Sequence, residues 1–270
     1  MTTVTGERPV VSDVAGEVSF RGALVSEWLK LRTLRSTVGV LLLAMVGMLA
    51  IGLAVAYNTR HLSRSLDAND LVASAPLQGY YLGQLLIGAL GVLLVTSEFS
   101  SGMVRTTFTV VPRRLPVLWA KLLVLVGAAL TTMVAMSFVA FLAAEGLISH
   151  YRTGISLSDP GALRVVIGTG VYLTLVGVIG AAVGWIVRST PGSLVAYLGI
   201  ILVVPALVGN AFGHGGKVVA KYLPSQAGGA FTQINPDGPS LHPWPGLGVM
   251  ALWAVVLVGV AAFTLRRRDA

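Results

Sequence analysis

The chain contains 270 residues, of which 55% are hydrophobic and 11% are charged, whereas a soluble globular domain carries about 25% charged residues. The composition therefore excludes an ordinary soluble domain and predicts a protein embedded in a lipid bilayer. The absence of cysteine excludes disulfides, thiolate metal ligands and cysteine nucleophiles. The formal net charge of +8 is interpreted mainly as control of membrane topology, and nucleic-acid binding is not expected.

Residues 1–18 are polar, have small side chains and show no apolar period, so we expect a disordered cytoplasmic leader without an assigned function. The first 35 residues include four acidic residues and no short apolar core before a small-residue cleavage site. A removable signal peptide is therefore not expected.

Residues 19–36 show apolar side chains at helical spacing and predict an amphipathic helix on the inner leaflet, leading directly into the first membrane span. The apolar stripe consists of Phe20, Leu24, Trp28, Leu31 and Leu34. Glu27 and Arg35 lie next to this stripe and make the amphipathicity imperfect. A simple basic juxtamembrane anchor therefore remains an alternative.

Six segments are long and apolar enough to cross a bilayer as helices, which predicts an all-α integral membrane protein whose permease-like region is residues 37–270. The expected spans are 38–57, 77–96, 122–144 (117–144 if Lys121 snorkels), 165–187, 193–213 and 246–265. Pro205 is expected to kink or break the fifth span, because proline cannot donate a hydrogen bond within a helix.

The distribution of Lys and Arg predicts that both termini are in the cytoplasm, since basic residues near membrane ends are retained inside. With six spans, both termini share one side of the membrane. Thirteen basic residues fall on that side and six on the other: Arg8, Arg21, Lys30, Arg32, Arg35, Arg105, Arg113, Arg114, Lys121, Arg188, Arg266, Arg267 and Arg268 against Arg60, Arg64, Arg152, Arg164, Lys217 and Lys221. We expect a multi-pass protein of the cytoplasmic membrane.

The sequence lacks the residue patterns that a catalytic site or an ATP-binding site requires. All four histidines lie in predicted external loops and none forms an i, i+4 pair. The sequence Gly215-Gly216-Lys217 superficially resembles a phosphate-binding loop, but Ala211 and Val218 replace its required residues. We therefore expect no enzyme activity and no bound cofactor or metal. The spans carry no central charge, so uphill transport would draw its energy from another subunit.

The external stretch 214–245 contains an amphipathic piece, Lys217 to Leu223, that is compatible with a short or partly re-entrant helix. Its many Gly and Pro residues equally permit an irregular connector. The small-residue pairs Gly79/Gly83 and Gly180/Gly184 are either close helix contacts or chance spacings. Gln78 and Gln84 in the second span and Asn210 in the fifth are compatible with a groove that could accept many lipids, antibiotics or peptides.

The connection between the second and third spans is the most patterned part of the chain. It opens with Glu98 at the membrane edge and extends to Lys121, and Pro112 stops a short candidate helix within it. Such a connection, about 25 residues long, can present a helix to a cytoplasmic partner. The alternative is that its basic residues only contact anionic lipid, which leaves Glu98 and Gly102 unexplained.

The order of residues in this connection resembles that of permease subunits of ABC transporters of the type 2 exporter superfamily. The matching residues are Glu98, Phe99, two small residues, Gly102, Met103, a further hydrophobe and Arg105, then Pro112-Arg113-Arg114 and Ala120-Lys121. The segment Glu27-Trp28-Leu29-Lys30-Leu31-Arg32 is similar to the connecting helix of that family, and Tyr222-Leu223-Pro224-Ser225-Gln226-Ala227 resembles its external segment. The resemblance covers nearly the whole chain.

The resemblance implies a half-transporter in which two permeases, identical or related, pair above two separate ABC ATPase subunits that hold ATP and Mg. It implies ATPase contacts through Phe99, Gly102, Met103, Arg105, Arg113 and Arg114, with Glu98 paired to a basic group at the inner membrane edge. Glu27, Trp28, Lys30 and Arg32 would belong to the connecting helix. Tyr222, Leu223 and Pro224 would help to close the external exit.

The function expected from these observations is export of an amphiphilic or hydrophobic compound. A non-transporting interaction protein, such as an immunity or sensor subunit that binds an ABC ATPase, is the main alternative. A membrane enzyme acting on lipid would require converging polar residues and is disfavoured. The sequence identifies neither the substrate nor the partner permease.

Overall fold

A computed structural model describes residues 20–59, 77–103, 114–148, 156–234 and 240–267. These residues form helices and turns and contain no strand, so the predicted all-α class is confirmed. Six of the helical stretches are long and apolar enough to cross a membrane. They are α2 (Arg35–Thr59), α4 (Tyr80–Ser100), α6 (Arg114–Ile148), α7 (Ala162–Val187), the fifth span (Thr190–Ala211) and α12 (Pro243–Arg267).

The helix α7 is the central helix of the bundle. It packs against α4, α6 and α12, and 83% of its most apolar stretch is buried, compared with 17% for α2. Many large apolar side chains on the outer helices are exposed, among them Val46 and Val255. An apolar exterior around an apolar core is expected of a bundle whose surroundings are hydrocarbon.

Glycines bring α4 and α7 into close contact. A Cβ atom on Gly91 would collide with the carbonyl oxygen of Gly177, and one on Gly180 would collide with the carbonyl oxygen of Gly88. Small residues at such a crossing let two helix backbones approach closely. The predicted helix contact at Gly180 is thus confirmed, and its neighbour Gly184 also faces α4.

The fifth span is not a continuous α-helix. It consists of α8 (Thr190–Leu198), the π-helical segment η2 (Gly199–Val203) and α9 (Val204–Ala211). Pro205 has no N–H to donate to the residue four positions earlier, and the N–H of Val204 donates to the carbonyl of Gly199, five positions earlier. The predicted interruption at Pro205 therefore takes the form of a wider helical turn just before it.

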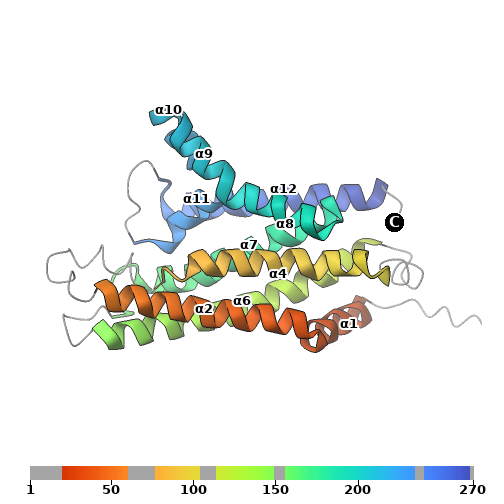
Figure 1. The fold of residues 1–270 in the computed structure, drawn as a ribbon, viewed down its shortest axis with the longest axis horizontal. Coiled ribbons are helices and arrows are strands. Elements are labelled where there is room, and N and C mark those ends of the chain that lie inside the picture. The colour runs from red at the N-terminus through yellow and green to blue at the C-terminus, as the bar shows by residue number, and fades with distance from the viewer. Residues whose placement is uncertain (1–19, 60–76, 104–113, 149–155, 235–239, 268–270) are drawn as a thin grey trace, which may run out of the picture.

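The described part of the segment after the fifth span is largely helical as far as residue 232. It contains α10 (Gly213–Ala220), α11 (Pro224–Gly229) and the 3-10 turn η3 (Ala230–Thr232). Figure 1 shows α9 and α10 leaning away from the bundle, while α11 lies beside α12. The short helix predicted around Lys217 is confirmed, although it begins earlier and ends before Leu223.

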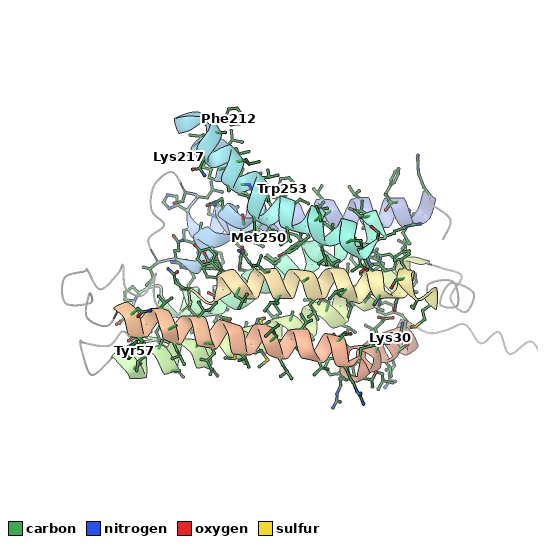
Figure 2. The ribbon with its side chains drawn as sticks, viewed as in Figure 1. Lys30, Tyr57, Phe212, Lys217, Met250 and Trp253 are labelled. Carbon is green, nitrogen blue, oxygen red and sulfur yellow. The ribbon has the colours of Figure 1, made fainter. Side chains whose placement is uncertain are left out.

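The first helix, α1 (Phe20–Thr33), precedes α2 with only Leu34 between them. It lies at one end of the bundle, where α12 also ends, and α10 lies toward the opposite end (Figure 1). We call these the α1 end and the α10 end. In Figure 2, Lys30 and Tyr57 mark the two ends of the α1–α2 pair. The predicted leader, residues 1–18, lies outside the described residues.

The connection between α4 and α6 is shorter than the sequence suggested. The α4 helix continues through Ser100 and α6 begins at Arg114, so Glu98 and Lys121 both lie within helices. Glu and Lys are good helix formers, so a charge can mark the end of an apolar stretch without ending the helix. The candidate helix before Pro112 falls in residues 104–113, outside the described residues.

The close approach of α4 and α7 predicts that Gly180→Ala is destabilising. We expect a loss of about 1–3 kcal/mol in the free energy of unfolding, because the added Cβ atom forces two packed backbones apart. Unfolding in mixed micelles titrated with an anionic detergent measures this loss. The matched control is Gly127→Ala in α6, where a Cβ would meet nothing within 4 Å. Equal stabilities of the two variants would contradict the close contact.

Candidate functional site

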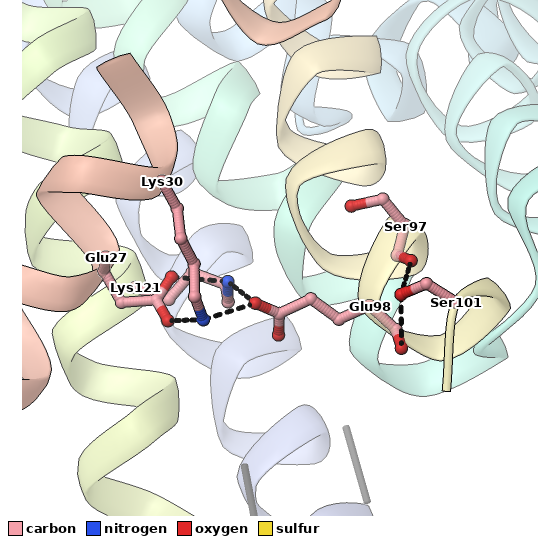
Figure 3. Close-up of polar contacts among 6 residues, drawn as sticks. All are labelled: Glu27, Lys30, Ser97, Glu98, Ser101 and Lys121. Carbon is pink, nitrogen blue, oxygen red and sulfur yellow. Dashed lines mark hydrogen bonds and ion pairs between the residues drawn. The ribbon is translucent and has the colours of Figure 1, made fainter. Parts of the chain in front are cut away.

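Four charged side chains meet at the α1 end of the bundle (Figure 3). The Nζ atom of Lys121 lies 2.6 Å from Oε2 of Glu27 and 2.9 Å from Oε1 of Glu98. The Nζ atom of Lys30 lies 2.7 Å from Oε1 of Glu27 and 2.8 Å from Oε1 of Glu98. Each lysine thus bridges both carboxylates, and we call these four residues the charge cluster.

The charge cluster joins three helices that are far apart in the sequence. Glu27 and Lys30 lie three residues apart on α1 and therefore share one face of that helix. Glu98 lies in the last turn of α4, and Lys121 lies two turns into α6. The predicted pairing of Glu98 with a basic group is confirmed, and its partners are Lys30 and Lys121.

The members of the charge cluster are largely removed from water. The exposed fraction of the side chain is 2% for Lys121, 5% for Glu27 and 7% for Glu98, and it reaches 23% only for Lys30. Isolated buried charges are strongly destabilising, but two carboxylates and two ammonium groups compensate one another. Each charge is therefore stable only while the others remain in place.

Lys30 is the member of the cluster that borders the surface. Burial by itself would lower the pKa of Lys30, but the hydrogen bonds and negative charges of Glu27 and Glu98 outweigh this effect and raise it above its ordinary value of 10.5. Lys30 consequently carries its charge throughout the physiological pH range.

The packed face of α1 differs from the predicted apolar stripe. Glu27 and Leu31 are buried, whereas Trp28 is 45% exposed, and Phe20 and Leu34 are also exposed. Glu27 can occupy the packed face because the two lysines neutralise its charge. Val25 and Leu29 are exposed as well, so α1 also carries apolar side chains on its outward side. Arg32 is exposed on the same helix.

Phe99, a predicted ATPase contact, packs mainly against the protein's own core. Its ring makes an edge-to-face contact with Trp185 at 5.6 Å, and the guanidinium of Arg188 lies over it at 5.5 Å. These contacts attach the end of α4 to the end of α7. Only part of the Phe99 ring remains accessible, which leaves Met103, at 44% exposure, as the more available apolar residue.

Gly102 ends α4. Its φ angle of +72° is in the left-handed region that glycine adopts without strain, and its N–H donates to the carbonyl of Phe99. The predicted contact residues Arg105 and Arg113 lie outside the described residues. Arg114 is the first residue of α6.

Sequence reasoning expected an ion pair only for Glu98 and missed the other three members of the charge cluster. The sequence pattern places Lys121 at the end of the cytoplasmic connection, where it could snorkel, and Glu27 beside the apolar stripe, where it makes the amphipathicity imperfect. The available signal was an acidic residue beside an apolar stripe together with a lysine inside an otherwise apolar segment. Unpaired, both would be destabilising, so each indicated a partner elsewhere in the chain.

The predicted external residues lie where the chain passes from α10 to α11. The carbonyl oxygen of Tyr222 accepts a hydrogen bond from Nε1 of Trp253 in α12, at 2.9 Å. Leu223 immediately precedes α11, and Pro224 begins it with a buried ring. The structure thus brings Tyr222, Leu223 and Pro224 together as an attachment between α11 and α12.

Arg164, which sequence reasoning treated only as an external charge, fixes the end of this segment. Its guanidinium donates to the carbonyl oxygens of Phe231, Gln233 and Ile234 at 3.1–3.3 Å. It also lies over the ring of Phe231, 5.8 Å from the ring centroid. One side chain from the first turn of α7 therefore holds η3 and the residues after it.

No protein-family model matches the sequence, and the search of curated proteins found no match. The residues and their geometry therefore carry the functional argument.

The charge cluster predicts that Lys121→Met is strongly destabilising. The substitution leaves two buried carboxylates with only Lys30 between them, and breaking a buried ion pair in this way costs about 3–5 kcal/mol. Unfolding in mixed micelles measures the loss. Arg32→Met, which removes an exposed charge from α1, is the control and should change stability by less than about 0.5 kcal/mol.

A double variant separates the electrostatic effect from simple loss of packing. Adding Glu27→Gln to Lys121→Met removes one of the uncompensated carboxylates, so the double variant should be more stable than the sum of the two single losses predicts. Strictly additive losses, or a Lys121→Met protein as stable as the wild type, would contradict the cluster.

The contacts of Arg164 predict that Arg164→Gln loosens the α11–η3 segment without unfolding the bundle. Hydrogen bonds to a charged group contribute about 1.5–3 kcal/mol each, so amide hydrogen exchange in residues 223–234 should accelerate at least tenfold. Hydrogen–deuterium exchange with mass spectrometry measures this rate. Arg266→Gln, at the opposite end, is the control and should leave the rate unchanged, and unchanged exchange in the Arg164 variant would rule out the anchoring role.

Proposed function

We propose that this chain is the membrane-spanning permease subunit of an ATP-driven exporter, related to ABC transporters of the type 2 exporter superfamily. The observation that carries the proposal is the charge cluster of Glu27, Lys30, Glu98 and Lys121. It ties the helix α1 to the two spans that flank residues 101–113, where the resemblance to these permeases is most detailed.

The charge cluster supplies a path for mechanical coupling. A force on residues 101–113 acts on the end of α4 and the start of α6, and both helices carry a member of the cluster. Separating those helices from α1 would leave buried charges without their partners, so the three helices resist being pulled apart. A push from a partner is thereby passed to α1 and, through Leu34, to α2.

In this proposal the α1 end faces the cytoplasm and both termini lie there. The start of α1 and the end of α12 lie at the same end of the bundle (Figure 1), and the sequence places thirteen basic residues on the side of the termini and six on the other. The positive-inside rule favours this orientation, with the protein in the cytoplasmic membrane.

The energy source is assigned to a separate ABC ATPase that binds ATP and Mg. The sequence around Lys217 lacks residues that a phosphate-binding loop requires. A second permease, identical or related, would complete the transport path. Met103, Arg105, Arg113 and Arg114 are the proposed contacts with the ATPase, and α11 with Tyr222, Leu223 and Pro224 is the proposed external closure.

The proposal predicts that the tagged protein, extracted from its native membrane in mild detergent, retains a soluble ATPase in stoichiometric amount. The double variant Arg113→Glu and Arg114→Glu should insert normally and lose the ATPase at least tenfold, because charge reversal opposes the proposed contacts. Quantitative mass spectrometry of the purified material measures the ratio of ATPase to permease.

The matched control is the double charge reversal Lys217→Glu and Lys221→Glu near the α10 end, which should retain the ATPase. Absence of any ATPase from the wild-type preparation, or equal retention by both double variants, would refute docking at this connection.

A further inference from the structure

A cavity of about 220 Å³ lies on the opposite half of the bundle from the charge cluster. Its walls come from α4, α7, the π-helical segment η2, α9 and the α11–η3 segment. The polar and aromatic side chains that line it are mainly Tyr80, Tyr81, Gln84, Tyr172, Gln226 and Gln233. Neither the charge cluster nor the proposed ATPase contacts account for it.

The polar groups that line the cavity are uncharged and can form hydrogen bonds. The lining supplies amides, phenols and the hydroxyls of Ser225 and Ser240, and none of the described residues that line the cavity is Asp, Glu, Lys, Arg or His. Amides and hydroxyls both donate and accept hydrogen bonds. An ionised group entering this space would leave water without meeting an opposite charge, which is strongly unfavourable. The lining therefore favours an uncharged group that can form several hydrogen bonds.

Key lining residues are held in place before any ligand arrives. The hydroxyl of Tyr172 donates to Oε1 of Gln84, and the hydroxyl of Tyr197 donates to the backbone carbonyl of Gln84 at 2.6 Å. The ring of Tyr172 packs so closely on Gly228 that a Cβ atom there would collide with it. Fixed polar groups bind more tightly because less side-chain freedom is lost on binding.

The cavity is too small for a whole amphiphile. Pockets for drug-sized compounds occupy about 300–1,000 Å³, so this cavity suits a headgroup. One wall is apolar and belongs to the fifth span, through Ile201, Leu202 and Pro205. Leu202 is 39% exposed, and Leu207, further along the same span, is 60% exposed. An apolar chain attached to the headgroup could leave the cavity along this surface.

We propose that this cavity binds the uncharged, hydroxyl-bearing headgroup of an amphiphile, whose apolar chain lies along the exposed face of the fifth span. Identifying that amphiphile as the exported compound rests on the proposed function, whereas the binding itself does not. The interruption at η2 contributes directly, because a wider helical turn forms part of the wall beside Gln84 and Tyr172.

The test compares three amphiphiles of equal chain length that differ only in the headgroup: decyl β-glucoside, decyl phosphate and decyltrimethylammonium. Each is added below its micelle concentration to the full-length protein in phosphatidylcholine nanodiscs, and empty nanodiscs correct for partitioning into lipid. We expect saturable binding of one glucoside per chain, at least tenfold tighter than either charged compound. Equal affinity for all three, tighter binding of a charged one, or no saturable binding would overturn the proposal.

Variants locate the site. The double variant Gln226→Leu and Gln233→Leu should weaken glucoside binding at least tenfold. The bundle should still form, because Gln226 is exposed and Gln233 is half-buried. Asn210→Leu is the control, because this exposed amide donates to Ala206 of its own helix and does not line the cavity. Unchanged binding in the double variant would refute the site.

The measurement separates this inference from the proposed function. It contains no ATPase, so a protein that fails to retain an ATPase can still bind the glucoside. Conversely, an intact ATPase complex without saturable binding would refute the cavity proposal alone.

Discussion

Compensation of buried charge is the constraint on which the α1 end of this protein depends. Glu27, Glu98 and Lys121 lie where water scarcely reaches them, and each is tolerated only because its partners occupy fixed positions on other helices. Hydrophobic contact could hold α1 beside α4 and α6 in many registers. Four charges that must all be paired select one of them.

The helix α4 links the two halves of the bundle. Glu98 near one end of this helix belongs to the charge cluster, and Gln84 toward the other lines the uncharged cavity. Between them, the backbone of Gly88 lies against Gly180 of α7, and Gly91 lies against Gly177, so the two helices are in close backbone contact. Packed interiors have low compressibility, so in the proposed exporter α4 would carry movement at the α1 end toward the cavity.

The fifth span is less buried in the bundle than α4 and α7: 22% of its most apolar stretch is buried, compared with 61% and 83%. The fifth span is interrupted by η2, exposes much of its surface, and leans away from the bundle together with α10 (Figure 1). Another part of the lining, α11 and η3, is attached at both ends: Trp253 donates to the carbonyl of Tyr222 just before α11, and Arg164 donates to the carbonyl of Gln233 just after η3. The cavity thus lies between a firmly held wall, formed by α4 and α7, and a wall built from an interrupted helix.

The sequence alone determined the helical class, the six apolar spans and the interruption at Pro205, because hydrocarbon requires each spanning backbone to satisfy its own hydrogen bonds and proline removes a donor. It also indicated that Glu98 needs a basic partner. Only the tertiary structure decided that Lys30 and Lys121 are those partners, that Glu27 belongs with them, and that Gln84 meets Tyr172. These pairs are separated by 23 to 94 residues, and local periodicity records which face a residue occupies but not which distant helix that face will meet.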